Sequence, residues 1–187
     1  MSLETFSGGR SWTGAPPGVP VLYYEDLEIG HEQWGGETIV NREEILAHAR
    51  EYDPWPFHID DNQAKNSVFG GLVASGGYTI NLWFKLGHQL LNVVTMGEVW
   101  ALLGGVEMKL RFVRGVTPSM RLRFMRRVTD KRVSSKPGRG VLFIHSEIID
   151  QDNGDPVLTI DEVVLIARKT AGEGLSVKIE NAPADLP

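Results

Sequence analysis

The stretch that decides the fold is "SGGYTINLWFKLGHQLLN", which spans residues 75–92. Its apolar residues are spaced as on a helix and cover much of the helix circumference. A helix that is apolar on most of its sides needs other parts of the chain to enclose it. We therefore predict a largely buried helix around which the rest of the domain is built. Its apolar residues are Ile80, Trp83, Phe84, Leu86, Leu90 and Leu91.

The chain after this helix has the pattern of β-strands. Basic and apolar residues alternate over residues 109–112 and 121–124, which is the two-residue period of a half-buried strand. Two longer apolar stretches follow at residues 140–150 and 157–169, and the "QDNGDP" segment between them contains an Asn-Gly pair, a strong hairpin signal. We predict four long antiparallel strands in this half of the chain.

The chain before the buried helix is predicted to hold one strand and two further helices. The strand covers residues 35–40, after which Asn41 is placed to cap a helix over Arg42–Tyr52. Pro54 ends this helix, because the residue before a proline is forced out of helical geometry. Asp60 is placed to cap a second, short helix. The order of elements predicts an α+β fold in which an antiparallel sheet wraps around a central buried helix.

Length and composition bound the organisation of the chain. Its 187 residues are enough for one domain, which we expect over residues 21–170, with a flexible arm at 1–20 and a loose tail at 171–187. No apolar run approaches the roughly 18 residues of a membrane span, and the start of the chain lacks the apolar segment of a secretory signal. The chain has no cysteine, so a disulfide or thiolate metal site is excluded. A cytoplasmic location is the expectation.

The charged residues are unevenly distributed. The net charge is −5, yet residues 107–140 carry eleven of the nineteen Lys and Arg residues and a local charge of +9. We interpret Lys109, Arg111, Arg121 and Arg123 as the solvated face of strands whose other face is apolar. Nucleic-acid binding is not expected, because the protein is acidic overall and the aromatic residues of these strands point away from the basic ones.

A candidate for acid-base chemistry lies in "EYDPWPFHIDDNQA", residues 51–64. Asp53 and His58 are separated by Pro54 and Pro56, whose fixed backbone angles reduce the entropy lost when the segment orders. A carboxylate and an imidazole held toward one water can deprotonate it and return a proton. The alternative is structural: Asp53 closes a turn and His58 is a buried polar side chain with its hydrogen bonds satisfied.

A second candidate is the glycine-rich segment "FGGLVASGG", residues 69–77, which leads into the buried helix. The first backbone N–H groups of a helix have no partner within it, so those near Gly76 can stabilise an oxygen that becomes enolate-like. We expect the glycine to leave room for a substrate carbonyl to approach. The alternative is that these glycines serve only turns and close helix packing.

Together these two segments resemble the MaoC-like dehydratase family, the (R)-specific enoyl-CoA hydratases of the hot-dog fold. Asp53, Pro56 and His58 match the family's D-x-N-P-x-H motif. The family's F-G-x-x-[IV]-[AV]-H-G segment at the start of the central helix is matched by Phe69, Gly70, Val73, Ala74 and Gly76. The resemblance extends loosely over residues 23–168, because the order of strands and the buried helix also fit.

The chain departs from the family pattern at three places. Trp55 replaces the motif's Asn, and Ser75 replaces the His before the helix glycine. The segment "RFVRGVTPSM" has Gly115 in place of the first Pro of the family's R-F-x-x-P-V-x-P-G-D, and Ser119-Met120 in place of Gly-Asp. From its size, we expect Trp55 to narrow the acyl pocket and favour compact acyl groups.

The resemblance implies a reversible syn addition of water to a trans-2-enoyl-CoA that gives a (3R)-3-hydroxyacyl-CoA. Asp53 and His58 would activate the water and the N–H of Gly76 would polarise the thioester carbonyl, with coenzyme A as part of the substrate and neither a cofactor nor a metal. The resemblance also implies a homodimer with sheets joined edge to edge, which fits the general need to cover sheet edges. The residues expected to bind the substrate are Trp55, Phe57, Phe69 and Ser75.

Two other functions remain open from the sequence. The first is an acyl-CoA thioesterase on the same fold, in which water attacks the carbonyl carbon. The second is an acyl-CoA-binding module without catalysis, which the changes at Trp55 and Ser75 suggest. In each of these functions some of the basic strand residues can contact the phosphates of coenzyme A. We expect no nucleic-acid or membrane partner.

Overall fold

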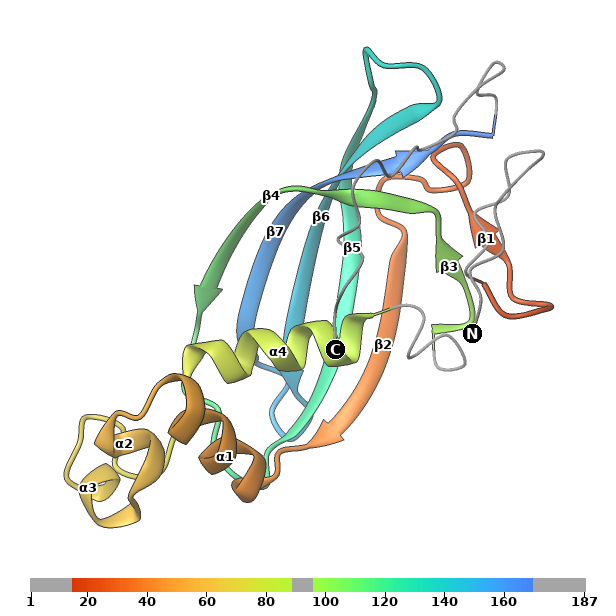
Figure 1. Cartoon of the computed structure of the whole chain (residues 1–187). Helices are drawn as coiled ribbons and strands as arrows, with labels where there is room; N and C mark the ends of the chain where they lie inside the picture. The colour runs from red at the N-terminus through yellow and green to blue at the C-terminus, as the bar shows by residue number, and fades with distance from the viewer. Residues whose placement is uncertain (1–14, 89–95, 170–187) are drawn as a thin grey trace, which may run out of the picture.

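The computed structural model describes residues 15–88 and 96–169, which contain one large sheet, two helices of 11 and 12 residues and several short elements (Figure 1). The helices are α1 (Arg42–Tyr52), α2 (Pro56–Ile59), α3 (Asp61–Lys65) and α4 (Gly76–Gly87). The five-stranded sheet consists of β2 (Glu32–Ile39), β4 (Leu102–Phe112), β5 (Arg121–Val133), β6 (Arg139–Asp150) and β7 (Pro156–Ala167). A separate parallel pair is formed by β1 (Val21–Leu22) and β3 (Val99–Trp100).

The large sheet is antiparallel and curves around α4, as predicted for a hot-dog fold (Figure 1). The strand order is β2-β5-β6-β7-β4, so β2 and β4 are the two outer strands. The helices α1, α2 and α3 gather at one end of the molecule, beside the N-terminal end of α4 (Figure 1). The predicted order of one strand, helices and four long strands is confirmed for this sheet.

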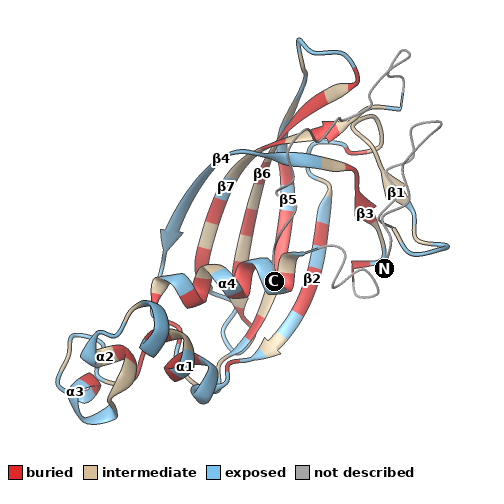
Figure 2. Cartoon of the chain, in the orientation of Figure 1, coloured by how far each residue is buried: buried red, intermediate tan, exposed pale blue. Residues whose placement is uncertain are grey.

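The main core lies between α4 and the concave face of the sheet (Figure 2). In the first half of β5, every second residue points toward α4. Leu122 and Phe124 are two of these residues, and they are buried in the same cluster as Leu82 and Leu86 of α4. A second cluster of buried residues surrounds Trp100 of β3. The first of these clusters contains the buried side chains of α4 and fixes the position of the helix across the sheet, which determines where each end of the helix lies.

Several local predictions are confirmed. The helix α1 has the predicted bounds, and the side chain of Asn41 accepts hydrogen bonds from the N–H groups of Glu43 and Glu44. The side chain of Asp60 caps α3 in the same way. Two elements were not predicted: the four-residue helix α2 and the short β1–β3 pair, both of which are too short to give a periodic pattern.

The central helix is shorter and less enclosed than predicted. It ends at Gly87, with His88 as its C-cap, whereas the prediction continued to Asn92; residues 89–95 lie outside the described part. The side chain of Phe84 is 50% exposed rather than buried. The reason is that a single sheet covers only one side of a helix, so the side away from the sheet faces outward.

The strand β4 also differs from the prediction of a half-buried strand. Leu110 and Phe112, which were expected in the core, are 39% and 47% exposed, and nearly all of β4 is exposed on both faces. The strand pairs only with β7, because it is an outer strand of the sheet.

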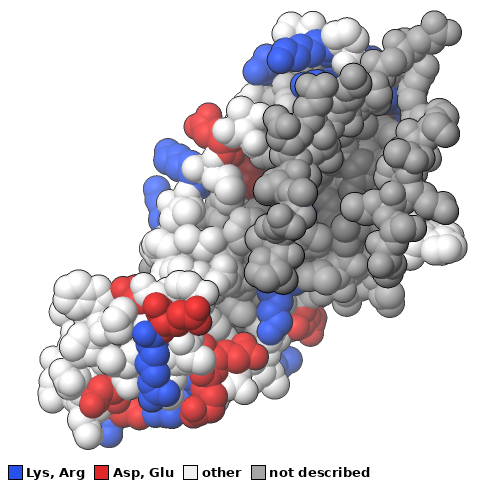
Figure 3. Space-filling view, viewed as in Figure 1, with Lys and Arg blue, Asp and Glu red and all other residues white. Residues whose placement is uncertain are grey.

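The basic strand residues mostly face outward, as interpreted from the sequence. Lys109, Arg111 and Arg121 are exposed, and Arg123 forms an ion pair with Glu37 at 3.3 Å. On the face drawn in Figure 3, basic and acidic side chains are mixed over α1, α2 and α3. Arg126 is an exception, because it is buried on the concave face.

The predicted arm at 1–20 and tail at 171–187 fall largely or wholly outside the described residues, so these boundaries stay predictions. No helix within residues 15–88 and 96–169 has the length and apolar character needed to cross a membrane.

Candidate active site

The connection between α1 and α2 places Asp53 and His58 side by side. Asp53 is the C-cap of α1 and its N–H donates to the carbonyl of Ala49. Pro54 follows, and Pro56 occupies the first turn of α2, where a missing N–H costs no helical hydrogen bond. His58 lies two residues further on in α2. The two prolines therefore end one helix and start the next, which sets the direction in which His58 leaves the chain.

The orientation of the His58 ring is fixed by the backbone. Its Nδ1 lies 2.6 Å from the carbonyl oxygen of Val73, and the side chain is almost fully buried. Because a carbonyl oxygen only accepts, Nδ1 must carry the proton, and Nε2 of the neutral ring keeps a free lone pair. The N–H of Val73 in turn donates to the carbonyl of Phe57 at 3.3 Å, so α2 is bound twice to the segment before α4.

The free nitrogen of His58 faces Asp53. The distance from Nε2 to Oδ2 of Asp53 is 3.7 Å, which is longer than a direct hydrogen bond. Two atoms this far apart can both bond one water at about 2.8 Å. The Asp53 side chain is partly exposed, so solvent reaches this position. The arrangement can hold a water between a carboxylate and an unprotonated imidazole nitrogen.

The N-terminus of α4 lies directly after the segment that binds His58. Ser75 is the N-cap, and its Oγ accepts a hydrogen bond from the N–H of Tyr78 at 3.2 Å. No acceptor among the described residues bonds the N–H groups of Gly76 and Gly77. These two donors are available for an oxygen of a ligand, as the sequence predicts for Gly76.

The reason for glycine at position 76 differs from the one expected. A Cβ atom on Gly76 would lie 2.9 Å from Cζ of Phe112, at the end of β4. The space beside Gly76 is therefore occupied by an aromatic ring, and the expectation that it is left open for a substrate is corrected. Glycine lets the Phe112 ring pack directly on the start of α4, and a larger residue would force the ring to move.

Ser75, expected to bind substrate, has a structural role in this chain. Its hydroxyl group is fully buried and lies 3.2 Å from Nδ1 of His48 in α1. Nε2 of His48 lies 3.1 Å from the amide nitrogen of Asn81, which can only donate, so Nδ1 carries the proton and donates to Ser75. The sequence analysis assigned no role to His48. Its position three residues after the buried Ile45 was the available signal that it faces the protein.

The other three residues expected to bind substrate form an aromatic row beside His58. The rings of Trp55 and Phe57 are stacked at 6.2 Å, and Phe57 contacts both His58 at 4.5 Å and Phe69 at 5.4 Å. The structure brings these side chains together, but the indole of Trp55 is 61% exposed. Trp55 therefore does not narrow a pocket within the single chain, and its effect on the acyl group stays a prediction.

No cluster of three or more His, Asp or Glu side chains suited to a metal ion occurs within the described ranges. The site is built from one acid-base pair, two backbone donors and an aromatic row.

Comparisons with known proteins agree with this architecture. A MaoC-like dehydratase from Rhodospirillum rubrum superposes with a TM-score of 0.69 at 30% sequence identity, over 79% of this chain and 97% of the other. An (R)-hydratase from A. caviae involved in PHA biosynthesis superposes with a TM-score of 0.55 at 20% identity, over 75% and 97% of the two chains, and shows the same fold.

The sequence comparisons are more limited. The uncharacterized protein YdeM of Bacillus subtilis is 31% identical over 94 residues, which are 50% of this chain and 63% of that protein. The match thus spans less than two thirds of this relative. No family model matches the chain.

Proposed function

Because the chain belongs to the family of MaoC-like dehydratases, we propose that it reversibly adds water to a trans-2-enoyl-CoA and forms a (3R)-3-hydroxyacyl-CoA. The observation that carries this proposal is the pairing of Asp53 with His58. In the neutral ring the bond from Nδ1 to Val73 makes Nε2 the acceptor nitrogen, and the 3.7 Å gap to Asp53 suits one shared water. A hydratase needs this combination of a base and a held water.

In the hydration direction, the oxygen of the shared water adds to the β carbon while Nε2 of His58 takes one of its protons. The carboxylate of Asp53 accepts the other O–H and so orients the water. The proton on His58 is then delivered to the α carbon, and the double bond gains one hydrogen and one hydroxyl group from the same water. Since both come from one side, the addition is syn.

Charge that develops on the thioester oxygen needs a donor as the β carbon is attacked. The free N–H groups of Gly76 and Gly77 at the start of α4 are the candidates, and the positive end of the helix dipole adds to their effect. The hydrogen bonds between α2 and Val73 support this assignment, because they bind the His58 segment three residues before Gly76.

We further propose that the active form is a homodimer joined through β4. This outer strand exposes a row of alternate apolar side chains, among them Val106 and Met108, which is unusual for an edge that stays in water. Its last residue, Phe112, contacts the Gly76 position. A partner on this edge would therefore lie next to the site.

The proposal is tested by following the loss of enoyl-thioester absorbance when the protein is added to crotonyl-CoA and to longer trans-2-enoyl-CoAs. We expect wild type to remove the absorbance, and Asp53→Asn and His58→Gln each to be slower by about 100-fold or more, the usual contribution of acid-base catalysis. Glu51→Gln replaces an exposed residue of the same segment. This variant is the control and should keep wild-type activity.

Other outcomes separate the alternatives. Release of free thiol from a saturated acyl-CoA, without hydration of crotonyl-CoA, would replace the proposal by a thioesterase. A rise in melting temperature with acyl-CoA but no turnover would indicate a binding module, because a ligand that binds only the folded state stabilises it. Equal activity of wild type and both site variants would overturn the assigned roles.

A further inference from the structure

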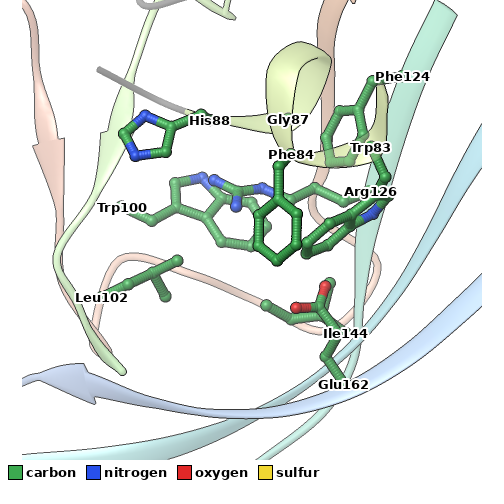
Figure 4. A pocket seen from close by; sticks show the side chains of 10 residues that line it. All are labelled: Trp83, Phe84, Gly87, His88, Trp100, Leu102, Phe124, Arg126, Ile144 and Glu162. Atoms are coloured by element: carbon green, nitrogen blue, oxygen red, sulfur yellow. The ribbon is translucent and has the colours of Figure 1, made fainter. Parts of the chain in front are cut away.

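A pocket of about 230 Å³, shown in Figure 4, lies beside the C-terminal end of α4, whereas the Asp53–His58 site lies near the N-terminal end of this helix. It is formed between the last turns of α4 and the strands β3, β5, β6 and β7, together with the first residue of β4. With a rise of about 1.5 Å per residue, the helix separates this pocket from Gly76 by on the order of 15 Å. The side chains that define its character are Trp83, Phe84, Phe124, Ile144, Arg126 and Glu162.

Arg126 is buried in this pocket without full pairing. Arg126 is 5% exposed, and its guanidinium carbon lies 3.8 Å from the centre of the Trp100 ring. Its Nε and Nη2 atoms have no hydrogen-bond partner among the described residues. Burial lowers the pKa of Arg126 to about 9, against the opposing effect of Glu162 and Glu98, so the group stays charged at neutral pH. A buried charge with free donors is costly unless something binds it.

Glu162 does not supply the missing partner. Its carboxylate accepts a hydrogen bond from Oγ of Ser146 at 3.2 Å, and within the described ranges no ion pair joins it to Arg126. Burial raises the pKa of Glu162, although Arg126 and the Ser146 hydroxyl act in the opposite direction. This carboxyl group therefore binds a proton more tightly than an exposed glutamate does.

The two free donors of Arg126 have a geometry that selects a ligand. Nε and Nη2 lie side by side on one edge of the planar guanidinium group, and their two N–H bonds fit the two oxygens of one carboxylate. The Trp100 indole lies beside the guanidinium, while aromatic and aliphatic side chains form most of the remaining wall (Figure 4). An apolar cavity of about 150 Å³ is sufficient for benzene, so this pocket has room for a ring or a short chain.

We propose that this pocket binds a small monocarboxylate with a compact apolar body. Its carboxylate would bond Nε and Nη2 of Arg126, and its apolar part would lie between Phe84, Phe124 and Ile144. The site is separate from Asp53 and His58, so the proposal does not depend on the hydratase reaction. The ligand would be a free acid rather than a coenzyme A thioester, because the carboxylate itself is the recognised group.

The experiment is a calorimetric titration of the full chain with benzoate, and with benzamide as a neutral ligand of the same shape. We expect benzoate to bind wild type and benzamide to bind at least about tenfold more weakly, since charge-assisted bonds are lost. Arg126→Met should weaken benzoate binding by a similar factor. Arg127→Met is the matched control, because Arg127 is the next residue of β5, is exposed on the other face and should leave binding unchanged.

A second measurement uses wild type alone, in case Arg126→Met does not fold. In a nuclear magnetic resonance titration with benzoate, the indole N–H signals of Trp83 and Trp100 should shift, while those of Trp34 and Trp55, which lie outside the pocket, should not. Asp53→Asn should bind benzoate like wild type. Equal binding of benzamide, unchanged binding by a folded Arg126→Met, or no shift of the Trp83 and Trp100 signals at millimolar benzoate would overturn the proposal.

Discussion

At the scale of single residues, the chemistry of the site depends on one backbone hydrogen bond. Without the carbonyl of Val73, either nitrogen of His58 could carry the proton, and the ring could rotate. With it, the lone pair of Nε2 is directed toward Asp53. The sequence contains Asp53 and His58 in a rigid segment, but the residue whose carbonyl orients the His58 ring lies fifteen positions away.

A prediction at this scale concerns Gly76. Because a Cβ atom there would lie 2.9 Å from the half-exposed Phe112 ring, which can shift, Gly76→Ala should lower the free energy of unfolding by about 1 kcal/mol, the low end of overpacking. The measurement is urea unfolding. Gly71→Ala is the control, since a Cβ atom at Gly71 meets nothing within 4 Å.

The double variant Gly76→Ala with Phe112→Leu separates packing from catalysis. The smaller side chain removes the colliding atom, so part of the lost stability should return. Alanine keeps the backbone N–H, and activity should therefore return together with stability. No loss of stability in Gly76→Ala would contradict the packing explanation.

At the scale of elements, the strands β6 and β7 are joined by a polar contact on the sheet face that is turned away from α4. His145 lies opposite Asp161 in the strand register, and its two ring nitrogens lie 2.7 Å from Asp161 and 3.0 Å from Glu147. Burial favours the neutral ring, but the hydrogen bonds to the two carboxylates outweigh it and raise the pKa of His145. The folded state therefore binds this proton more tightly than the unfolded state.

This contact makes stability depend on pH with a definite sign. The contribution of His145 is complete below the unfolded pKa, about 6.5, and is lost as the pH rises through the higher folded pKa. We predict that the difference in unfolding free energy between wild type and His145→Gln decreases as the pH is raised across this window. Urea unfolding at several pH values measures it. A difference that stays constant or grows with pH would contradict the assignment, and Asp161→Asn should reduce the pH dependence.

At the scale of the whole molecule, the sheet ends in an exposed apolar strand. Val106 of β4 is 63% exposed, and its neighbours along the strand include several other exposed apolar side chains. Such an edge pairs readily with another chain. Because Phe112 lies close to Gly76, the proposed assembly through β4 would lie next to the proposed site.

We predict that light scattering will give a mass of about twice the 20.7 kDa of the chain, and that Val106→Glu will shift the protein toward the monomer. The reason is that a carboxylate would be buried at the interface without a partner. Val133→Glu, a change at an exposed valine at the end of β5, is the matched control and should leave the mass unchanged. A wild-type protein that is monomeric at micromolar concentration would disprove the dimer.

Much of the fold was predictable because it depends on local rules. The cap at Asn41, the end of α1 before Pro54 and the cap at Asp60 are interactions between residues a few positions apart, so the sequence alone is sufficient to find them. The alternation along β5 likewise indicates which side chains face the core. The two motifs around His58 and Gly76 identified the candidate site, and the structure places both at the N-terminal end of α4.

By itself the sequence determined the type and order of the main elements, because the spacing of apolar residues that distinguishes a helix from a strand is a property of residues close together in the chain. It did not reveal which strand would be an edge, and so Phe112 was expected in the core. Arg126 lies on the same face of β5 as Leu122 and Phe124, so the alternation predicts that it points inward. Only the packing of α4 across the sheet buries its guanidinium group and leaves its Nε and Nη2 donors without a partner among the described residues. The tertiary structure decided these features, because burial and proton positions depend on contacts between residues far apart in the chain.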